Sequence, residues 1–261
     1  GGNVSIGAKH DIKARNLTVS SDSGAVKVIG EHDVSIENGY SESNDAFALK
    51  YKEKGLLNKK ETKNKTNDES KNALMSTLSG HTVVVGANND VILTSSNVVS
   101  TAGTSVLAGH NVITDAAAEH TLSTASKDVK KSGIMGAGMG IMIGKKQSKD
   151  NYSIDETTHK ATTLGSTDGE VTLQAGDTVH LTTTDIIADK GIRLSGQDIV
   201  LDGKENHYLA KESHEYKSSG LTVSLGGSVA NAINTAYGLQ QKAKGREDKR
   251  LAALEYMEAG K

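Results

Sequence analysis

Apolar and polar residues alternate along most of the chain in short units that recur about every 20–22 residues. GGNVSIGAKHDIKARNLTV is followed by GAVKVIGEHDVSIENG, which places Asp11 and Asp33 22 positions apart. The same form recurs in TVVVGANNDVILTSSNVV and TSVLAGHNVITDAA, and again in EVTLQAGDTVHLTTTDII and GIRLSGQDIVLDG. Each unit has the form apolar-x-apolar, a turn that contains Gly, then Asp or Asn, and again apolar-x-apolar. This period-two alternation predicts short strands with one buried face.

A unit of about 20 residues cannot bury its own apolar face, but stacking on neighbouring units builds a continuous core. Small aliphatic residues would fill the narrow interior, in keeping with aromatic residues at only 3% of the chain and with the absence of Pro. The sequence therefore predicts an all-β fold, a right-handed parallel β-helix (solenoid) of about six coils spaced about 4.8 Å apart. Ile92 is expected to point into this core.

A longer period groups the units into three pairs that begin near Gly2, Gly80 and Gly169. A polar segment follows each pair and leads to a glycine step at Gly55, Gly133 or Gly220, 78 and 87 positions apart. We expect three hairpin-like inserts in a β-helix at 1–227, with blocks at about 1–79, 80–165 and 166–227. Helical spacing after Gly227 predicts a short C-terminal helical tail, or a junction to the next domain, at 228–261.

The insert KKSGIMGAGMGIMIGKK is the most apolar stretch of the chain. We interpret its ten uncharged residues, from Ile134 to Ile143, as one strand, and about 9–11 residues suffice for a tilted strand to cross a bilayer. An alternative stays open, in which the strand belongs to a hairpin that covers the flank of the β-helix. The candidate membrane-interaction residues in this insert and the next are Ile134, Met135, Ala137, Met139, Ile141, Ile143, Leu221, Val223 and Leu225.

Composition excludes several classes of partner and site. The 30 basic and 32 acidic residues nearly balance, so no nucleic-acid partner is expected, and the absence of Cys excludes disulfides and thiolate metal sites. The chain starts inside a repeat, without a visible signal peptide or any apolar run long enough for a transmembrane helix. We interpret it as a piece of a longer protein.

Histidines precede the turn Asp or Asn at His10, His32 and His110, and stacking could align them into a weak metal ladder. The simpler interpretation is a column of polar turn residues, because Asn89 and Gln197 occupy the same position. The turn aspartates lack the nine-residue spacing of calcium-binding repeats, and a column of Asn/Asp hydrogen bonds at the turns is the simpler account. We therefore expect no metal site.

Enzyme motifs are also absent from the sequence. Gly136, Gly138 and Gly140 are not followed by the Gly-Lys-Ser/Thr of a phosphate-binding loop, and neither Gly-x-Ser-x-Gly nor His-Glu-x-x-His occurs. A polysaccharide lyase on a β-helix would need charged residues clustered in a groove, which the sequence does not indicate. We expect neither an enzyme nor a cofactor.

The double pattern resembles the haemagglutinin repeats of filamentous haemagglutinin and of contact-dependent growth inhibition effectors (the CdiA type). The matching segments are GEVTLQAGDTVHL, TSVLAGHNVIT and KSSGLTVSLGG. The resemblance implies a segment of a large exoprotein that a Gram-negative cell exports, through an outer-membrane secretion transporter, by two-partner secretion. It further implies localisation at the cell surface, with periplasmic holding before delivery, and neighbouring domains of the same chain.

Two functions follow from this resemblance. In the toxin-delivering branch, the segment would help a C-terminal toxin cross the target-cell outer membrane, with that membrane or its proteins as partners. In the adhesin branch, it would be a passive structural shaft.

Overall fold

The structure is a computed structural model that describes residues 1–137 and 140–224. Every regular element in these ranges is a β-strand, and they contain no helix long and apolar enough to cross a membrane. The helical tail expected at 228–261 lies outside the described residues. Parallel pairing joins the repeating units, so the predicted β-helix is confirmed.

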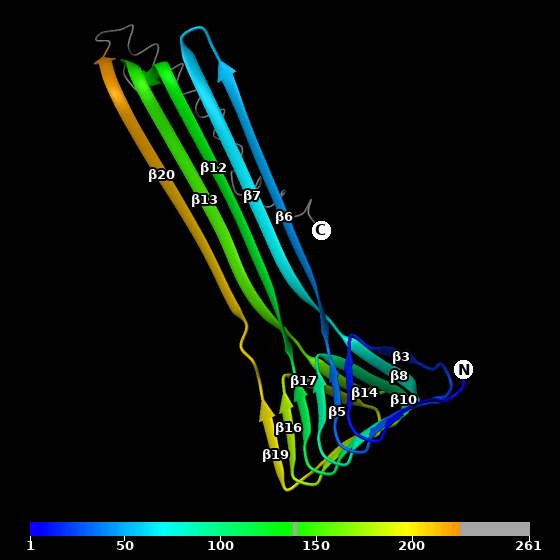
Figure 1. The fold of residues 1–261 in the computed structure, drawn as a ribbon. Coiled ribbons are helices and arrows are strands. Elements are labelled where there is room, and N and C mark those ends of the chain that lie inside the picture. Colours follow the sequence, from blue (N-terminus) through cyan, green and yellow to red (C-terminus); the bar gives the residue numbers. More distant parts are fainter. Residues whose placement is uncertain (138–139, 225–261) are drawn as a thin grey trace. The chain divides into compact units, whose positions relative to one another are not determined.

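Six coils stack in the described part of the chain, and the second strand of each lies in a six-stranded sheet (Figure 1). The alternation read from the sequence forms these strands in parallel register, with Val34 opposite Ile12 and Val91 opposite Val34. In spatial order the strands are β2 (Ile12–Arg15), β5 (Val34–Glu37), β9 (Val91–Thr94), β11 (Val112–Asp115), β16 (Thr178–Thr182) and β19 (Asp198–Asp202).

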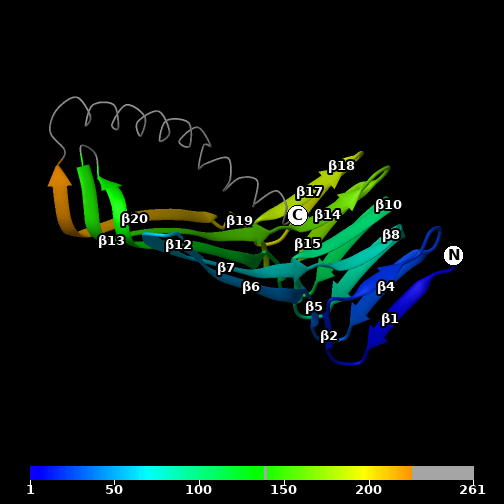
Figure 2. The ribbon, with the colours of Figure 1, turned by 90° about the horizontal axis from the view of Figure 1, so that it is seen from above.

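The other two faces belong to a nine-stranded sheet (Figure 2). One face comprises β1 (Val4–Ala8), β4 (Ala25–Gly30), the second halves of β8 (Ser76–Ala87) and β10 (Ser96–Ala108), β15 (Glu170–Ala175) and β18 (Gly191–Ser195). The other comprises β3 (Thr18–Ser20), the first halves of β8 and β10, β14 (Thr162–Ser166) and β17 (Thr184–Ala188).

The core is built from columns of small aliphatic side chains, one from each coil. Residues along a column are in register across the coils, and most of those in the middle coils are fully buried. One such column is Ile12, Val34, Val91, Val112, Val179 and Ile199. Identical branched residues stack well at the strand spacing, which explains how a core forms with few aromatic residues.

The assignment of Ile92 to the core is wrong. Val91 and Leu93 have no exposed surface, whereas Ile92 is half-buried and lies between them on β9. Because side chains alternate across a strand, Ile92 points away from the core. The turn ends at Asp90, so the first residue after it, not the second, is the inward one.

The same backbone conformation recurs at one corner of the solenoid in every second coil. After β2, β9 and β16, the residues Asn16, Ser95 and Thr183 adopt a left-handed backbone conformation, with φ of 51°, 44° and 48°. Their amides donate to the carbonyls of Glu37, Asp115 and Asp202, which are the last strand residues of the next coil. In that next coil the chain does not turn the corner but leaves the solenoid in a long strand.

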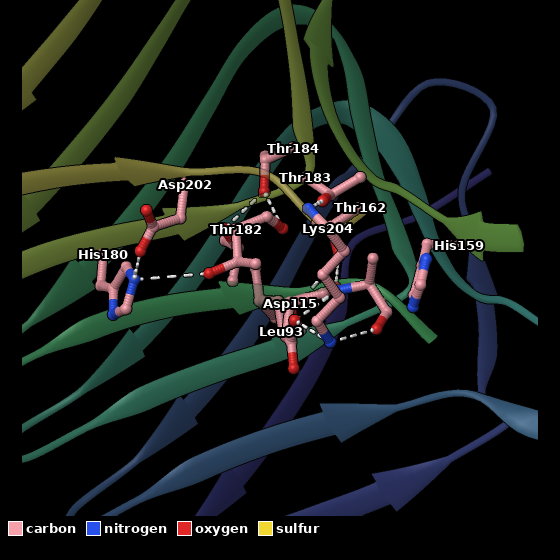
Figure 3. A network of polar contacts seen from close by, with 12 residues as sticks. Leu93, Asp115, His159, Thr162, His180, Thr182, Thr183, Thr184, Asp202 and Lys204 are labelled. Atoms are coloured by element: carbon pink, nitrogen blue, oxygen red, sulfur yellow. Dashed lines mark hydrogen bonds and ion pairs between the residues drawn. The ribbon is translucent and has the colours of Figure 1, made fainter. Parts of the chain in front are cut away.

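Polar contacts hold the corner where the second long excursion leaves and returns (Figure 3). Asp115 ends β11 before the exit, and its carboxylate pairs with the Lys204 ammonium at 2.6 Å. The buried Thr162, at the start of β14 after the return, donates its hydroxyl to the Asp115 carbonyl at 2.7 Å. Asp115 therefore lies where the chain leaves the solenoid and also bonds the residue at which the chain returns.

The excursions pair with one another in a five-stranded sheet (Figure 1). In spatial order its strands are β20 (His207–Ser224), β13 (Gly140–Lys160), β12 (Ala117–Ala137), β7 (Asn58–Leu74) and β6 (Gly39–Lys54). Two of the three expected inserts are thus long hairpins, β6–β7 and β12–β13, and the described part of the third is one strand.

Candidate functional site

The apolar run from Ile134 to Ile143 is not one strand, so this interpretation is wrong. Ile134 lies near the end of β12 and Ile143 near the start of β13, so the run is divided between two strands. Each arm carries only about half of the run, which is fewer residues than a bilayer-crossing strand needs. The sequence did not show this division because Gly, Ala and Met are as compatible with one continuous strand as with the ends of two strands.

An exposed apolar group nevertheless forms on β13 and β20. Side-chain contacts join Asp150 to His214 and Asn151 to Ser213, and Gly144 lies against Gly220. These pairs share one antiparallel register, in which each step back along β13 is opposite one step forward along β20. Successive pairs point to alternate faces of the sheet.

Four candidate residues meet in this register. Ile143 stands opposite Leu221 and Ile141 opposite Val223, all on one face. Their exposed fractions are 53%, 69%, 41% and 51%, respectively. We call Ile141, Ile143, Leu221 and Val223 the tip patch, a contiguous apolar surface of the kind that soluble proteins rarely leave open without a function.

Two of the three equivalent glycine steps, Gly133 and Gly220, lie where neighbouring backbones of this sheet approach closely. A Cβ on Gly133, whose φ is +112°, would lie 2.3 Å from the Leu57 carbonyl oxygen. A Cβ on Gly220 would lie 2.4 Å from the Ile143 carbonyl oxygen. Only glycine permits such close backbone approach, which explains why the sequence repeats Gly at these points.

The remaining candidate residues have mixed positions. Ile134 and Met135 are half-buried on β12, and Met142, which was not a candidate, is buried with its sulfur 3.7 Å from the Ser218 hydroxyl. Met139 and Leu225 lie outside the described residues, as does the side chain of Ala137. Leu56, in the corresponding segment of the first insert, is fully exposed at the tip of the first hairpin.

Charged side chains cover the body of the first hairpin. Glu61 on β7 is within 3.6 Å of Lys50, Lys52 and Lys63. Partial burial raises the pKa of the Glu61 carboxyl, but the three ammonium groups outweigh this and hold the pKa below its ordinary value. The tip patch therefore belongs to a sheet whose first hairpin is covered by charged side chains.

The turn column predicted from the sequence forms on the solenoid. Asp33 accepts hydrogen bonds from the Asp90 amide and the Asn89 side chain, at 3.2 and 2.8 Å. Asp90 in turn accepts the Asn111 amide at 2.9 Å. Each turn carboxylate therefore satisfies an amide of the next coil, as an Asn/Asp hydrogen-bond column should.

Three side chains of the column, on its first two coils, have pKa values shifted from their ordinary values. The hydrogen bond from His32 holds the pKa of the Asp11 carboxyl below its ordinary value, and the same contact raises the pKa of His32. The Asn89 amide lowers the pKa of Asp33. These shifts favour the charged form of each group.

Comparison with known proteins identifies the repeat. The model of the hemagglutinin repeat matches residues 143–253. A protein named tRNA nuclease CdiA from Escherichia coli O6:K15:H31 is 37% identical over 79% of the chain, which corresponds to 6% of that relative. The 16S rRNA endonuclease CdiA of Enterobacter cloacae is 37% identical over 78% of the chain and 6% of its own length.

A third relative covers less of the chain. The deoxyribonuclease CdiA of Yersinia pseudotuberculosis serotype O:3 is 34% identical over 63% of the chain and 16% of its own length. The chain thus spans a small part of these curated relatives, and no solved structure matches it. Together, the hemagglutinin-repeat match and these relatives place the chain in a known group: it is a repeat region of the filamentous haemagglutinin and CdiA type.

Proposed function

We propose that the chain is a repeat segment of a large secreted exoprotein and that it helps a C-terminal toxin cross the outer membrane of a target cell during contact-dependent growth inhibition. An outer-membrane transporter of the producing Gram-negative cell would export the exoprotein to the cell surface, and the part to be delivered would be held in the periplasm before delivery. The nuclease activities would belong to other parts of such proteins, and this segment would not be an enzyme.

The names of the relatives support this division of labour. Three relatives with different named targets, tRNA, 16S rRNA and DNA, share this repeat region. A segment common to proteins that cut different nucleic acids is better suited to delivery than to cleavage. The balanced charge of the chain also offers no attraction for a polyanion.

The tip patch is the observation that carries the proposal. Ile141, Ile143, Leu221 and Val223 form an exposed apolar face at one end of the five-stranded sheet. Apolar side chains at this position can enter the acyl boundary of a bilayer, and the neighbouring Lys145 and Lys146 can remain at the headgroups. The short apolar arms favour contact with the membrane surface by the isolated segment.

A substitution in the tip patch tests membrane contact. Ile141→Asp should reduce flotation with vesicles of phosphatidylethanolamine and phosphatidylglycerol at least tenfold, and should abolish target-cell inhibition by the full exoprotein. Ile29→Asp is a matched control, because Ile29 on β4 has the same exposed fraction of 41% but belongs to the solenoid. Circular dichroism verifies that both variants fold.

Two outcomes would overturn the proposal. Wild-type flotation and inhibition by a folded Ile141→Asp protein would reduce the tip patch to a surface feature. Equal losses in Ile141→Asp and Ile29→Asp would show that any added surface charge has the same effect, and would favour the alternative of a passive shaft.

A further inference from the structure

Two histidines of the turn column lie directly above each other on the first two coils. The imidazole rings of His10 and His32 stack with centroids 4.8 Å apart and planes inclined by 26°. Both Nδ1 atoms lie 2.9 Å from the same oxygen, Oδ1 of Asp11. The ligand atoms of these three residues all lie within 4.8 Å of one another, the one such group in the part of the chain that the structure describes.

A second carboxylate borders the same point. Oδ2 of Asp33 is 3.1 Å from Nδ1 of His32. Lys13, the nearest ammonium, approaches the other oxygen of Asp11, at 3.6 Å, and leaves Oδ1 to the histidines. Two imidazoles and up to two carboxylates therefore converge from adjacent coils, and the exposed fractions of the His10 and His32 side chains, 77% and 50%, leave them open to an ion from solvent.

The spacing suits a late divalent transition metal. In a tetrahedral zinc site with metal–ligand distances of about 2.0–2.2 Å, neighbouring donor atoms are about 3.3–3.5 Å apart. Three of the donor-atom distances here are 2.9–3.1 Å, and the ligand atoms of His10, Asp11 and His32 all lie within 4.8 Å of one another. Side-chain movements of about 1 Å would bring them to the tetrahedral spacing. Imidazole favours Zn²⁺, Ni²⁺ or Cu²⁺ over Mg²⁺ or Ca²⁺, which prefer oxygen ligands.

We propose that His10, Asp11 and His32, with Asp33 as a fourth ligand, form a site for a divalent transition metal that links the first two coils of the solenoid. This inference departs from the expectation of no metal site. The expectation rested on Asn and Gln at the same turn position in other coils, but in the first two coils His stacks on His. The proposal is independent of the tip patch.

The third histidine of the column provides an internal comparison. His110 has Asp90 at 3.1 Å on Nδ1 and Asp177 at 3.5 Å on Nε2, so its carboxylate neighbours lie on opposite nitrogens. The neighbouring coil position before it holds Asn89 instead of a second imidazole. His110 has the same kind of surroundings as His32 but lacks the partner ring, and it should not bind the ion tightly.

Isothermal titration of the tag-free chain with Zn²⁺ tests the site. We expect one saturable site per chain, and His10→Asn or His32→Asn should weaken binding at least tenfold. Asp11→Asn should also weaken it while still accepting the Asp33 amide, which lies 3.4 Å from Oδ1 of Asp11. His110→Asn should bind within twofold of the unsubstituted chain, and Ca²⁺ should not compete.

A chelator provides a second readout that does not depend on the variants. Zn²⁺ should raise the thermal midpoint of the chain, and EDTA should reverse the increase. The absence of a saturable site in the unsubstituted chain would overturn the proposal. A loss of affinity in His110→Asn equal to that in His32→Asn would also overturn it, because it would show diffuse binding to surface imidazoles.

Discussion

The solenoid and the five-stranded sheet are built from strands of the same chain, yet different interactions stabilise them. In the solenoid, inward residues such as Val85, Leu93 and Leu173 have no exposed surface. In the sheet, β6 is exposed at every residue after Gly39, and the described strands bury few side chains, which are Thr62, Ala117, Met142 and Ile154. The first region rests on a dry core, and the second on strand pairing and cross-strand polar contacts.

This difference indicates which substitutions each region tolerates without loss of stability. Burial of an unpaired charge costs several kcal/mol in a dry core, whereas a single sheet with water on both faces has little core to disrupt. The sheet can therefore display apolar side chains at its tips without losing the contacts that hold it. Its sensitive positions are instead the glycines at which backbones approach closely.

The largest effect is expected in the solenoid core. Leu93→Asp should destabilise the chain by more than about 4 kcal/mol, because it buries a carboxylate without a partner. Ile92→Asp on the adjacent outward position should cost about 1 kcal/mol or less. Urea unfolding followed by circular dichroism measures both. Similar losses in the two variants would show that the inward and outward faces of β9 are misassigned.

A smaller and more local effect is expected in the sheet. Gly133→Ala should cost about 1–3 kcal/mol, because its φ of +112° disfavours any side chain and its Cβ would meet the Leu57 carbonyl. Hydrogen exchange should accelerate for amides of β7 and β12 near the tip and stay unchanged in the solenoid core. Gly203→Ala is the control, since a Cβ there meets nothing within 4 Å. Unchanged exchange in Gly133→Ala would contradict the close approach.

The smallest effect concerns an ion pair between the first two coils. Arg15 donates to Glu37 at 2.8 Å and holds the pKa of Glu37 below its ordinary value. Such a lowered pKa stabilises the fold above the unfolded-state pKa, and the contribution is lost as pH falls through the folded-state value. Glu37→Gln should therefore cost up to about 1 kcal/mol at pH 7.

The difference between Glu37→Gln and the unsubstituted chain should vanish near pH 3. Urea midpoints at the two pH values measure it, and 1 M NaCl at pH 7 should also reduce it. A difference that persists at acid pH would mean that Glu37 acts through packing instead of charge.

Much of the solenoid could be predicted from local pattern. The recurrence of apolar-x-apolar units around a Gly-Asp turn was enough to predict parallel strands, about six coils and the polar column at Asp33 and Asp90. These features depend on contacts between equivalent positions of neighbouring repeats. Because the repeats have similar sequences, the sequence of one repeat indicates which residues its neighbour offers. The face of Ile92 was misjudged because the exact end of the turn sets the phase of the alternation.

Only the tertiary structure decided what the inserts do. Gly55, Gly133 and Gly220 were recognisable as equivalent points, but their sequence did not reveal that the inserts pair into one sheet or that the apolar run is divided between β12 and β13. The sequence allowed a histidine column, but only the coil spacing shows that His10 stacks on His32, 22 positions away. The tip patch and the metal site both arise from such long-range register, which is set when coils stack and strands pair, because neither group of residues is contiguous in the chain.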